Sequence, residues 1–171
     1  AAEYNLADTG ITTHAAFFDY DKDGDLDVYI LNNSFIPVSS LNYSNKRDLR
    51  DKDWDVAEIL KGGGDKLLRN DNGKFVDVSE KSGIYGSLIG FGLGVTVGDV
   101  NGDLYPDIYI SNDFYERDYL YVNNKNGTFS SREQEYFKHT SSNSMGQDVI
   151  DINNDGLADI VELDMSPEDN Y

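Results

Sequence analysis

The sequence has no cysteine and is poor in proline, histidine and positive charge. Its 171 residues include 3 Pro and 2 His, and 14 Lys and Arg stand against 32 Asp and Glu. Without cysteine the chain can form neither a disulfide nor a thiolate metal site, and the compartment is left open. The formal net charge of −18 argues against binding to nucleic acid or to an anionic membrane surface, because both attract Lys and Arg.

Long apolar runs and catalytic motifs are missing as well. No stretch of about 18 apolar residues occurs, so we expect no membrane insertion, and we expect no signal peptide within the first residues of the sequence. A nucleophile elbow, a P-loop, a dinucleotide fingerprint and a zinc-protease motif are all absent. The two histidines, His14 and His139, lie in unrelated sequence contexts. The sequence therefore favours a non-catalytic protein.

Acidic residues instead recur at alternate positions of one short stretch, Asp19–Asp27, which has glycine at its sixth position. Hard cations such as Ca²⁺ take six to eight oxygen ligands. A chain supplies several of them by curling round the ion, and the bend needs a residue that tolerates positive φ. Without a cation, carboxylates this close would repel one another. We predict a calcium site in this stretch.

The same oxygen register returns in Asp99–Asp107 and Asp151–Asp159. Three copies make a chance pattern improbable, so we predict about three Ca²⁺ ions, one per repeat. Leu104 stands where the second copy would have glycine. Side-chain oxygens at positions one, three, five and nine and a carbonyl at position seven give the predicted ligands: Asp19, Asp21, Asp23, Asp25 and Asp27; Asp99, Asn101, Asp103, Tyr105 and Asp107; Asp151, Asn153, Asp155, Leu157 and Asp159.

Each loop is flanked by segments typical of β-strands. Small and apolar residues precede it, and β-branched or aromatic residues follow it, as in Val28–Leu31. Two further strand segments follow the first two loops, joined by turns that contain Asn72-Gly73 and Asn126-Gly127, a strong hairpin signal. Each repeat is therefore predicted to be four antiparallel strands. Repeated units of about 50 residues with four strands are typical of β-propeller blades.

The fold class predicted from this pattern is all-β, with propeller-type four-stranded blades. We expect residues 1–12 to end a preceding blade, 13–84 to form a blade with an insertion at about 34–64, 85–140 to form a second blade, and 141–171 to form half of a third. About two and a half blades is fewer than propellers typically contain. We therefore expect a fragment of a larger propeller rather than open ends that pair with other copies.

The insertion is the least regular part of the chain. Ser34 to Asn45 is predicted to be a loop, and Asp53 to Leu60 a short helix that Asp53 caps and Gly62 to Gly64 end. The insertion serves either as a docking loop or as a cover for a strand edge. The sequence leaves both open.

These residues resemble a known family. The loops and the preceding Phe91-Gly92 are similar to the FG-GAP or VCBS repeat of integrin α-type β-propellers, in which such loops bind Ca²⁺. Gly90 to Tyr121 is also similar to large secreted VCBS proteins of Bacteroidetes-type bacteria and to the cartilage acidic protein group. The resemblance implies an extracellular or cell-surface location, in bacteria secreted or at the outer membrane. It also implies adhesion or assembly with protein partners.

Other calcium-binding loops and another function also fit parts of the sequence. Asp151–Glu162 fits an EF-hand loop, but the equivalent twelfth residues are Ile30 and Ile110, and strands rather than helices flank all three loops. Glu162 is therefore expected to face solvent, and the helix-flanked dockerin loop is excluded in the same way. For function, a carbohydrate-binding or polysaccharide-degrading propeller module is the alternative to a protein-interaction module, so a glycan stays open as a ligand.

Overall fold

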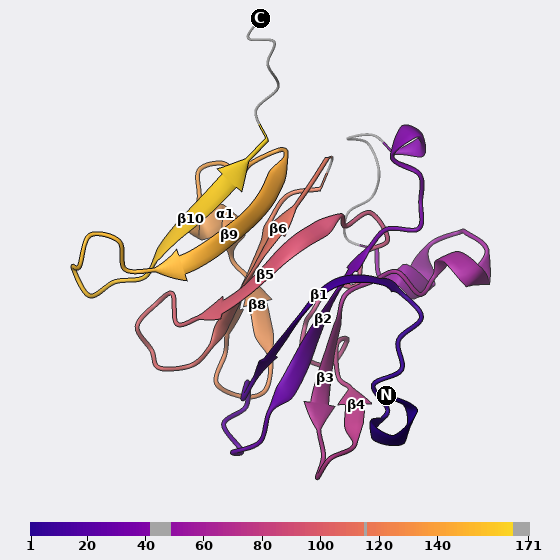
Figure 1. Ribbon diagram of the computed structural model, residues 1–171, viewed down its shortest axis with the longest axis horizontal. Coiled ribbons are helices and arrows are strands. Elements are labelled where there is room, and N and C mark those ends of the chain that lie inside the picture. The colour runs from indigo at the N-terminus through magenta and orange to yellow at the C-terminus, as the bar shows by residue number, and fades with distance from the viewer. Residues whose placement is uncertain (42–48, 115, 166–171) are drawn as a thin grey trace, which may run out of the picture.

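The computed structural model describes residues 1–41, 49–114 and 116–165. Within them the chain forms ten strands in three antiparallel sheets and almost no helix (Figure 1). The predicted all-β fold of blade-like sheets is therefore confirmed. No helix among these residues is long and apolar enough to cross a membrane.

The first two sheets each have four strands in sequential order. The first contains β1 (Ile11–Phe18), β2 (Asp27–Asn33), β3 (Lys66–Asn70) and β4 (Phe75–Asp77). The second contains β5 (Gly92–Gly98), β6 (Asp107–Asn112), β7 (Tyr119–Asn123) and β8 (Phe129–Ser131). The third sheet is the hairpin of β9 (Ser144–Ile150) and β10 (Asp159–Asp164). The expected division of the chain into blades at residues 12, 84 and 140 stays a prediction.

Tight turns join the outer strands as the Asn-Gly pairs predict. Between β3 and β4, Asn72 and Gly73 both have positive φ, and Asp71 and Lys74 exchange two backbone hydrogen bonds. This is the two-residue turn whose twist matches antiparallel strands. Between β7 and β8 the turn is longer, because the Asn124 N–H bonds to the Thr128 carbonyl across three residues. Lys125 and Gly127 supply positive φ there.

The main core lies between the first and second sheets. Apolar side chains from β2, β3, β5, β6, β7 and β8 meet there in one cluster, with Tyr29, Leu31, Ile108, Ile110 and Tyr121 completely buried. Strands β2 and β6 are buried along nearly their whole length, because both faces of each are covered. The hairpin loops that carry the predicted metal ligands project from one edge of these sheets (Figure 1).

The insertion is less helical than expected. Asp51–Asp53 and Glu58–Leu60 are separate 3₁₀ turns, so the predicted helix from Asp53 to Leu60 is wrong. Trp54 is extended (φ −74°, ψ 137°), which ends the first turn after three residues. A further 3₁₀ turn covers Val38–Ser40, and the rest of the predicted loop at 42–45 lies outside the described residues. The one α-helix among the described residues, α1, is the single turn Glu133–Tyr136.

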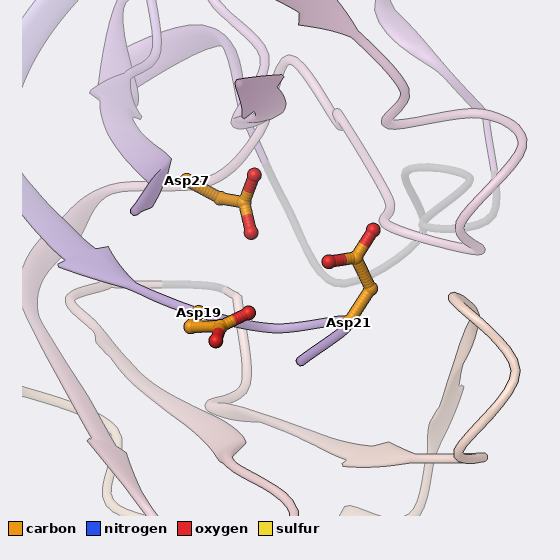
Figure 2. A group of neighbouring side chains, drawn as sticks. All are labelled: Asp19, Asp21 and Asp27. Carbon is orange, nitrogen blue, oxygen red and sulfur yellow. The ribbon is translucent and has the colours of Figure 1, made fainter. Parts of the chain in front are cut away.

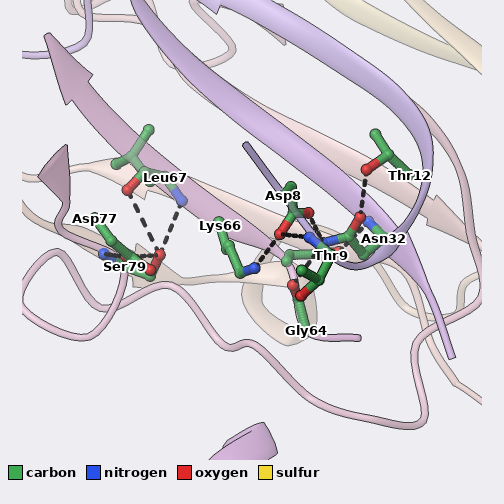
Figure 3. A network of polar contacts seen from close by, with 10 residues as sticks. Asp8, Thr9, Thr12, Asn32, Gly64, Lys66, Leu67, Asp77 and Ser79 are labelled. Carbon is green, nitrogen blue, oxygen red and sulfur yellow. Dashed lines mark hydrogen bonds and ion pairs between the residues drawn. The ribbon is translucent and has the colours of Figure 1, made fainter. Parts of the chain in front are cut away.

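The N-terminal segment begins with a 3₁₀ turn, Ala2–Tyr4, and no strand of the described residues pairs with it. Polar contacts fix the segment to the first sheet (Figure 3). Asp8 accepts hydrogen bonds from Lys66 and from the Asn32 side chain, which in turn accepts one from the Thr12 hydroxyl.

Candidate metal centre

Each predicted loop connects two paired strands. Asp19–Asp27 joins β1 to β2, Asp99–Asp107 joins β5 to β6, and Asp151–Asp159 joins β9 to β10. The loops are therefore the tips of β-hairpins, as the flanking residues predict. Because no helix adjoins the third loop, the EF-hand and dockerin alternatives do not apply to this part of the described chain.

The three loops also share one backbone conformation. Positive φ occurs at the fourth and sixth positions of every loop, which are Lys22 and Gly24, Gly102 and Leu104, and Asn154 and Gly156. Leu104 (φ 70°) thus takes the left-handed conformation that glycine takes in the other two loops. A leucine with positive φ is strained, because its Cβ crowds the backbone. The second loop therefore keeps the shared shape despite its departure in sequence.

The first aspartate of each loop closes the turn. Asp19 accepts hydrogen bonds from the backbone N–H groups of Asp23 and Gly24, each at 3.1 Å. The carboxylates of Asp99 and Asp151 accept the two equivalent bonds, at 2.7 to 3.1 Å. A carboxylate has about four lone-pair sites, so each of these aspartates retains acceptor capacity for another ligand.

The ninth-position aspartates anchor the loops to the sheets. Asp27 and Asp107 are completely buried. Asp27 accepts the N–H of Tyr20 at 3.2 Å and that of Asn70, on β3, at 2.8 Å. Asp107 makes the same two bonds, to Val100 and to Asn123 on β7. Burial raises the pKa of Asp27 to about 6 and raises that of Asp107 as well.

Asn70 and Asn123 were not predicted as part of the loops. Their side chains also donate to loop carbonyls, from Asn70 to Leu26 at 3.2 Å and from Asn123 to Pro106 at 3.2 Å. Both residues end the third strand of their repeat, although Asn70 follows Asp27 by 43 residues and Asn123 follows Asp107 by 16. That shared position is the sequence signal through which the pair could have been found.

Carboxylate oxygens converge most closely in the first loop. Asp19, Asp21 and Asp27 offer one oxygen each within 4.8 Å of one another, and their carboxylates point toward a common space (Figure 2). The Oδ1 atoms of Asp21 and Asp25 are buried without a hydrogen-bond partner. Burial and repulsion from Asp23 and Asp19 raise the pKa of Asp21.

The other predicted ligands of the first loop have different surroundings. Asp23 accepts the N–H of Asp25 at 3.1 Å and does not belong to the close group. All of the loop's candidate donors are oxygen atoms, two of which lack partners. Such a set fits Ca²⁺, whose preferred ligands are carboxylate and carbonyl oxygens. The residues present therefore fit the ion that the sequence predicts.

In the second loop a lysine lies beside one of the predicted ligands. Lys125 Nζ is 3.4 Å from the Asp103 carboxylate. Asp103 also accepts the N–H of Tyr105 at 2.9 Å, and Asn101 accepts the N–H of Asp103 at 3.0 Å. Lys22, from the first loop, lies 4.4 Å from the centre of the Tyr105 ring. Cation–π contacts of this kind bring the two loops together.

The third loop repeats these contacts in a more exposed setting. Asn153 and Asp155 accept the N–H groups of Asp155 and Leu157 at 2.9 and 2.8 Å, and Asp159 accepts that of Ile152 at 3.1 Å. No third strand adjoins β10 among the described residues, so Asp159 lacks the second bond that Asp27 and Asp107 make. Close groups of three acidic residues were found, within the described chain, only in the first loop.

Glu162 does not face solvent as expected. Its Oε1 is buried, and its Oε2 lies 3.4 Å from the hydroxyl of Tyr109 on β6. The side chain points toward the second sheet, against which the neighbouring strand β9 packs. His14 is exposed on β1, and its Nδ1 accepts the N–H of Val95 at 3.4 Å.

The comparisons with known proteins support the repeat. Residues 99–162, which contain the second and third loops, match the family model described as an FG-GAP-like repeat. No curated protein matches the chain.

Proposed function

Because the chain is an FG-GAP-type repeat protein, we propose that it is a calcium-stabilised, non-catalytic β-propeller-type module that works at the cell surface or outside the cell. The observation that carries the proposal is the repetition of one loop structure. Three loops share positive φ at the same two positions and the same carboxylate-to-backbone hydrogen bonds. In the first loop, buried oxygens without partners are left to receive a cation.

The role of the ion is structural. A divalent cation neutralises carboxylates that otherwise repel one another, and it fixes the hairpin that they belong to. In a chain of net charge −18, about three Ca²⁺ ions would remove about six negative charges. Because the loops are assembled only in the folded state, the binding free energy adds to folding stability.

Thermal unfolding in calcium and in excess chelator tests this role. Stability should rise with calcium concentration, by about 2.7 kcal/mol per site at a hundred times the dissociation constant. For a domain of this size that corresponds to several degrees in Tm. Magnesium at equal ionic strength separates specific binding from charge screening. An identical melting curve in calcium and in chelator would refute the structural role.

The surface role is protein interaction, in adhesion or in assembly of an envelope complex. FG-GAP repeats are generally non-catalytic, and loops held by a rigid sheet scaffold are typical binding surfaces. Strong net negative charge also suits an exposed, soluble face. Protease treatment of intact cells, with an internal protein as control, tests the location. Protection of the chain in intact cells would contradict it.

A further inference from the structure

The second and third sheets meet through a polar joint, whereas the joint between the first two sheets is apolar. In the first joint Leu31, Val95 and Ile110 are all buried in the core. One repeat later, at the same positions relative to the loops, the chain has Ser111, Gln147 and Glu162. Ser111 hydrogen-bonds to the Gln147 side chain, and Gln147 Nε2 donates to the Tyr109 carbonyl at 3.4 Å.

A carboxyl pair lies within this polar joint. Asp118, just before β7, is completely buried, and its carboxyl and that of Glu162 on β10 both lie within hydrogen-bonding distance of the Tyr109 hydroxyl. Tyr109 donates its hydroxyl proton to Asp118 Oδ2 at 2.9 Å, and the backbone N–H of Asn112 binds Oδ1 at 2.7 Å. The first sheet has the same arrangement in Tyr29, Asn32 and Asp65, with Ile110 in place of the glutamate.

The donors present do not satisfy two ionised carboxylates. Tyr109 has one hydroxyl proton, and the shorter contact shows that it goes to Asp118. Glu162 Oε2 is 3.4 Å from the same hydroxyl, and Oε1 has no partner. Two carboxylates that approach the same hydroxyl, one of them completely buried, also repel each other strongly, and such pairs retain a proton. One proton between the carboxyls supplies the missing donor and removes the repulsion.

We propose that Asp118 and Glu162 share one proton that ties the β9–β10 hairpin to the second sheet, and that this joint loosens as the pH rises and the proton is lost. The joint is thus a pH-sensitive contact between sheets. It requires no calcium, because neither residue belongs to the predicted ligands.

Polar and titratable groups surround the pair on each packed element. Strand β6 contributes Tyr109, β9 contributes neutral Gln147, and β10 also carries Asp164. His139 lines, with Glu162 and Asp164, an open cavity of about 380 Å³. Arg117, next to Asp118, is paired with Glu133 at 3.0 Å.

Burial, followed by the charge and hydrogen bond of Glu162, raises the pKa of Asp118 to about 8. Because the pKa is raised only while the β9–β10 hairpin is packed on the second sheet, opening of this contact releases the proton. The stabilisation is therefore complete below the ordinary aspartate pKa of about 4 and is lost as the pH rises to about 8. His139 lines the same cavity as Glu162, so it needs its own control.

Carboxyl carbon NMR of the wild-type protein, recorded with calcium present throughout, tests the shared proton directly. Asp118 and Glu162 should titrate together, with one proton leaving well above the usual carboxyl range. If both carboxyls are ionised by about pH 5, the proposal is wrong. This measurement needs no variant and so does not depend on one folding.

Hydrogen exchange of the β10 amides, corrected for its intrinsic pH dependence, tests the opening. The opening constant should rise by up to tenfold per pH unit below about pH 8, since one proton is released. Glu162→Gln, which keeps the shape and donates to Asp118, should reduce this dependence to about threefold or less. Glu162→Ile, which copies the first joint, should also remove most of it.

Matched controls identify the group responsible. Asp164→Asn removes a carboxylate from the same strand, and His139→Asn removes the neighbouring histidine; both should keep the wild-type pH dependence of opening. A wild-type slope in Glu162→Gln would overturn the proposal. So would loss of the slope in either control.

Discussion

Replacing Leu104 with glycine should stabilise the protein. Leu104 has φ 70°, and the left-handed conformation costs a non-glycine residue about 1–2 kcal/mol. Glycine avoids this cost but gains about 0.4–1 kcal/mol of unfolded-state entropy. Little packing is lost, because the leucine is 77% exposed. The net gain is about 0.5–1 kcal/mol, or about 1–4 °C in Tm.

Thermal denaturation followed by circular dichroism, in excess calcium, measures this gain. Leu104→Ala is the matched control, because it removes the side chain but keeps a Cβ at positive φ. It should leave Tm nearly unchanged. Gly24→Ala should show the opposite effect in the first loop, where φ is 97°, and destabilise by about 1 kcal/mol. A lower Tm for Leu104→Gly, or an equal rise for Leu104→Ala, would refute the strain argument.

Three further changes test other parts of the structure. Burial raises the pKa of Asp65 to about 7, so its stabilising contribution is complete below about pH 4 and is lost as the pH rises to about 7. Asp65→Asn should therefore flatten the pH dependence of the free energy of unfolding, measured with urea, over that range. An unchanged pH dependence in the variant would contradict a protonated Asp65. Gly92→Ala should destabilise the protein by about 1–3 kcal/mol, because the new Cβ would clash with the Leu31 side chain between the first two sheets. Chemical denaturation measures this loss. Wild-type stability in the variant would show that the packing between these sheets accommodates a methyl group. Asp151→Ala should remove about one equivalent of bound calcium, which equilibrium dialysis measures. An unaltered number of bound calcium ions would contradict a calcium site in the third loop.

The loops and their hairpins could be predicted because their chemistry is local. Oxygen-bearing residues at alternate positions of Asp19–Asp27, with β-type residues on both sides, specify a turn between two strands. The spacing then repeats twice, which identifies the larger unit. Short-range patterns of this kind depend little on the rest of the fold.

The contacts between sheets could not be predicted, because they join residues far apart in the chain. Glu162 was expected in solvent because no glutamate recurs at its position in the other loops, yet it lies against Tyr109, which belongs to another sheet. The helix expected at 53–60 also failed, since local propensity is a weak guide where tertiary contacts decide. Leu104 shows the converse case, in which the shared loop structure overrides the local preference of one residue.

Isothermal titration calorimetry of the calcium-free protein with Ca²⁺ tests the central claim most directly, with magnesium as the competing ion. The account predicts uptake of about three ions per chain, one at each hairpin loop. Absence of calcium binding at the millimolar concentrations found outside cells would contradict it.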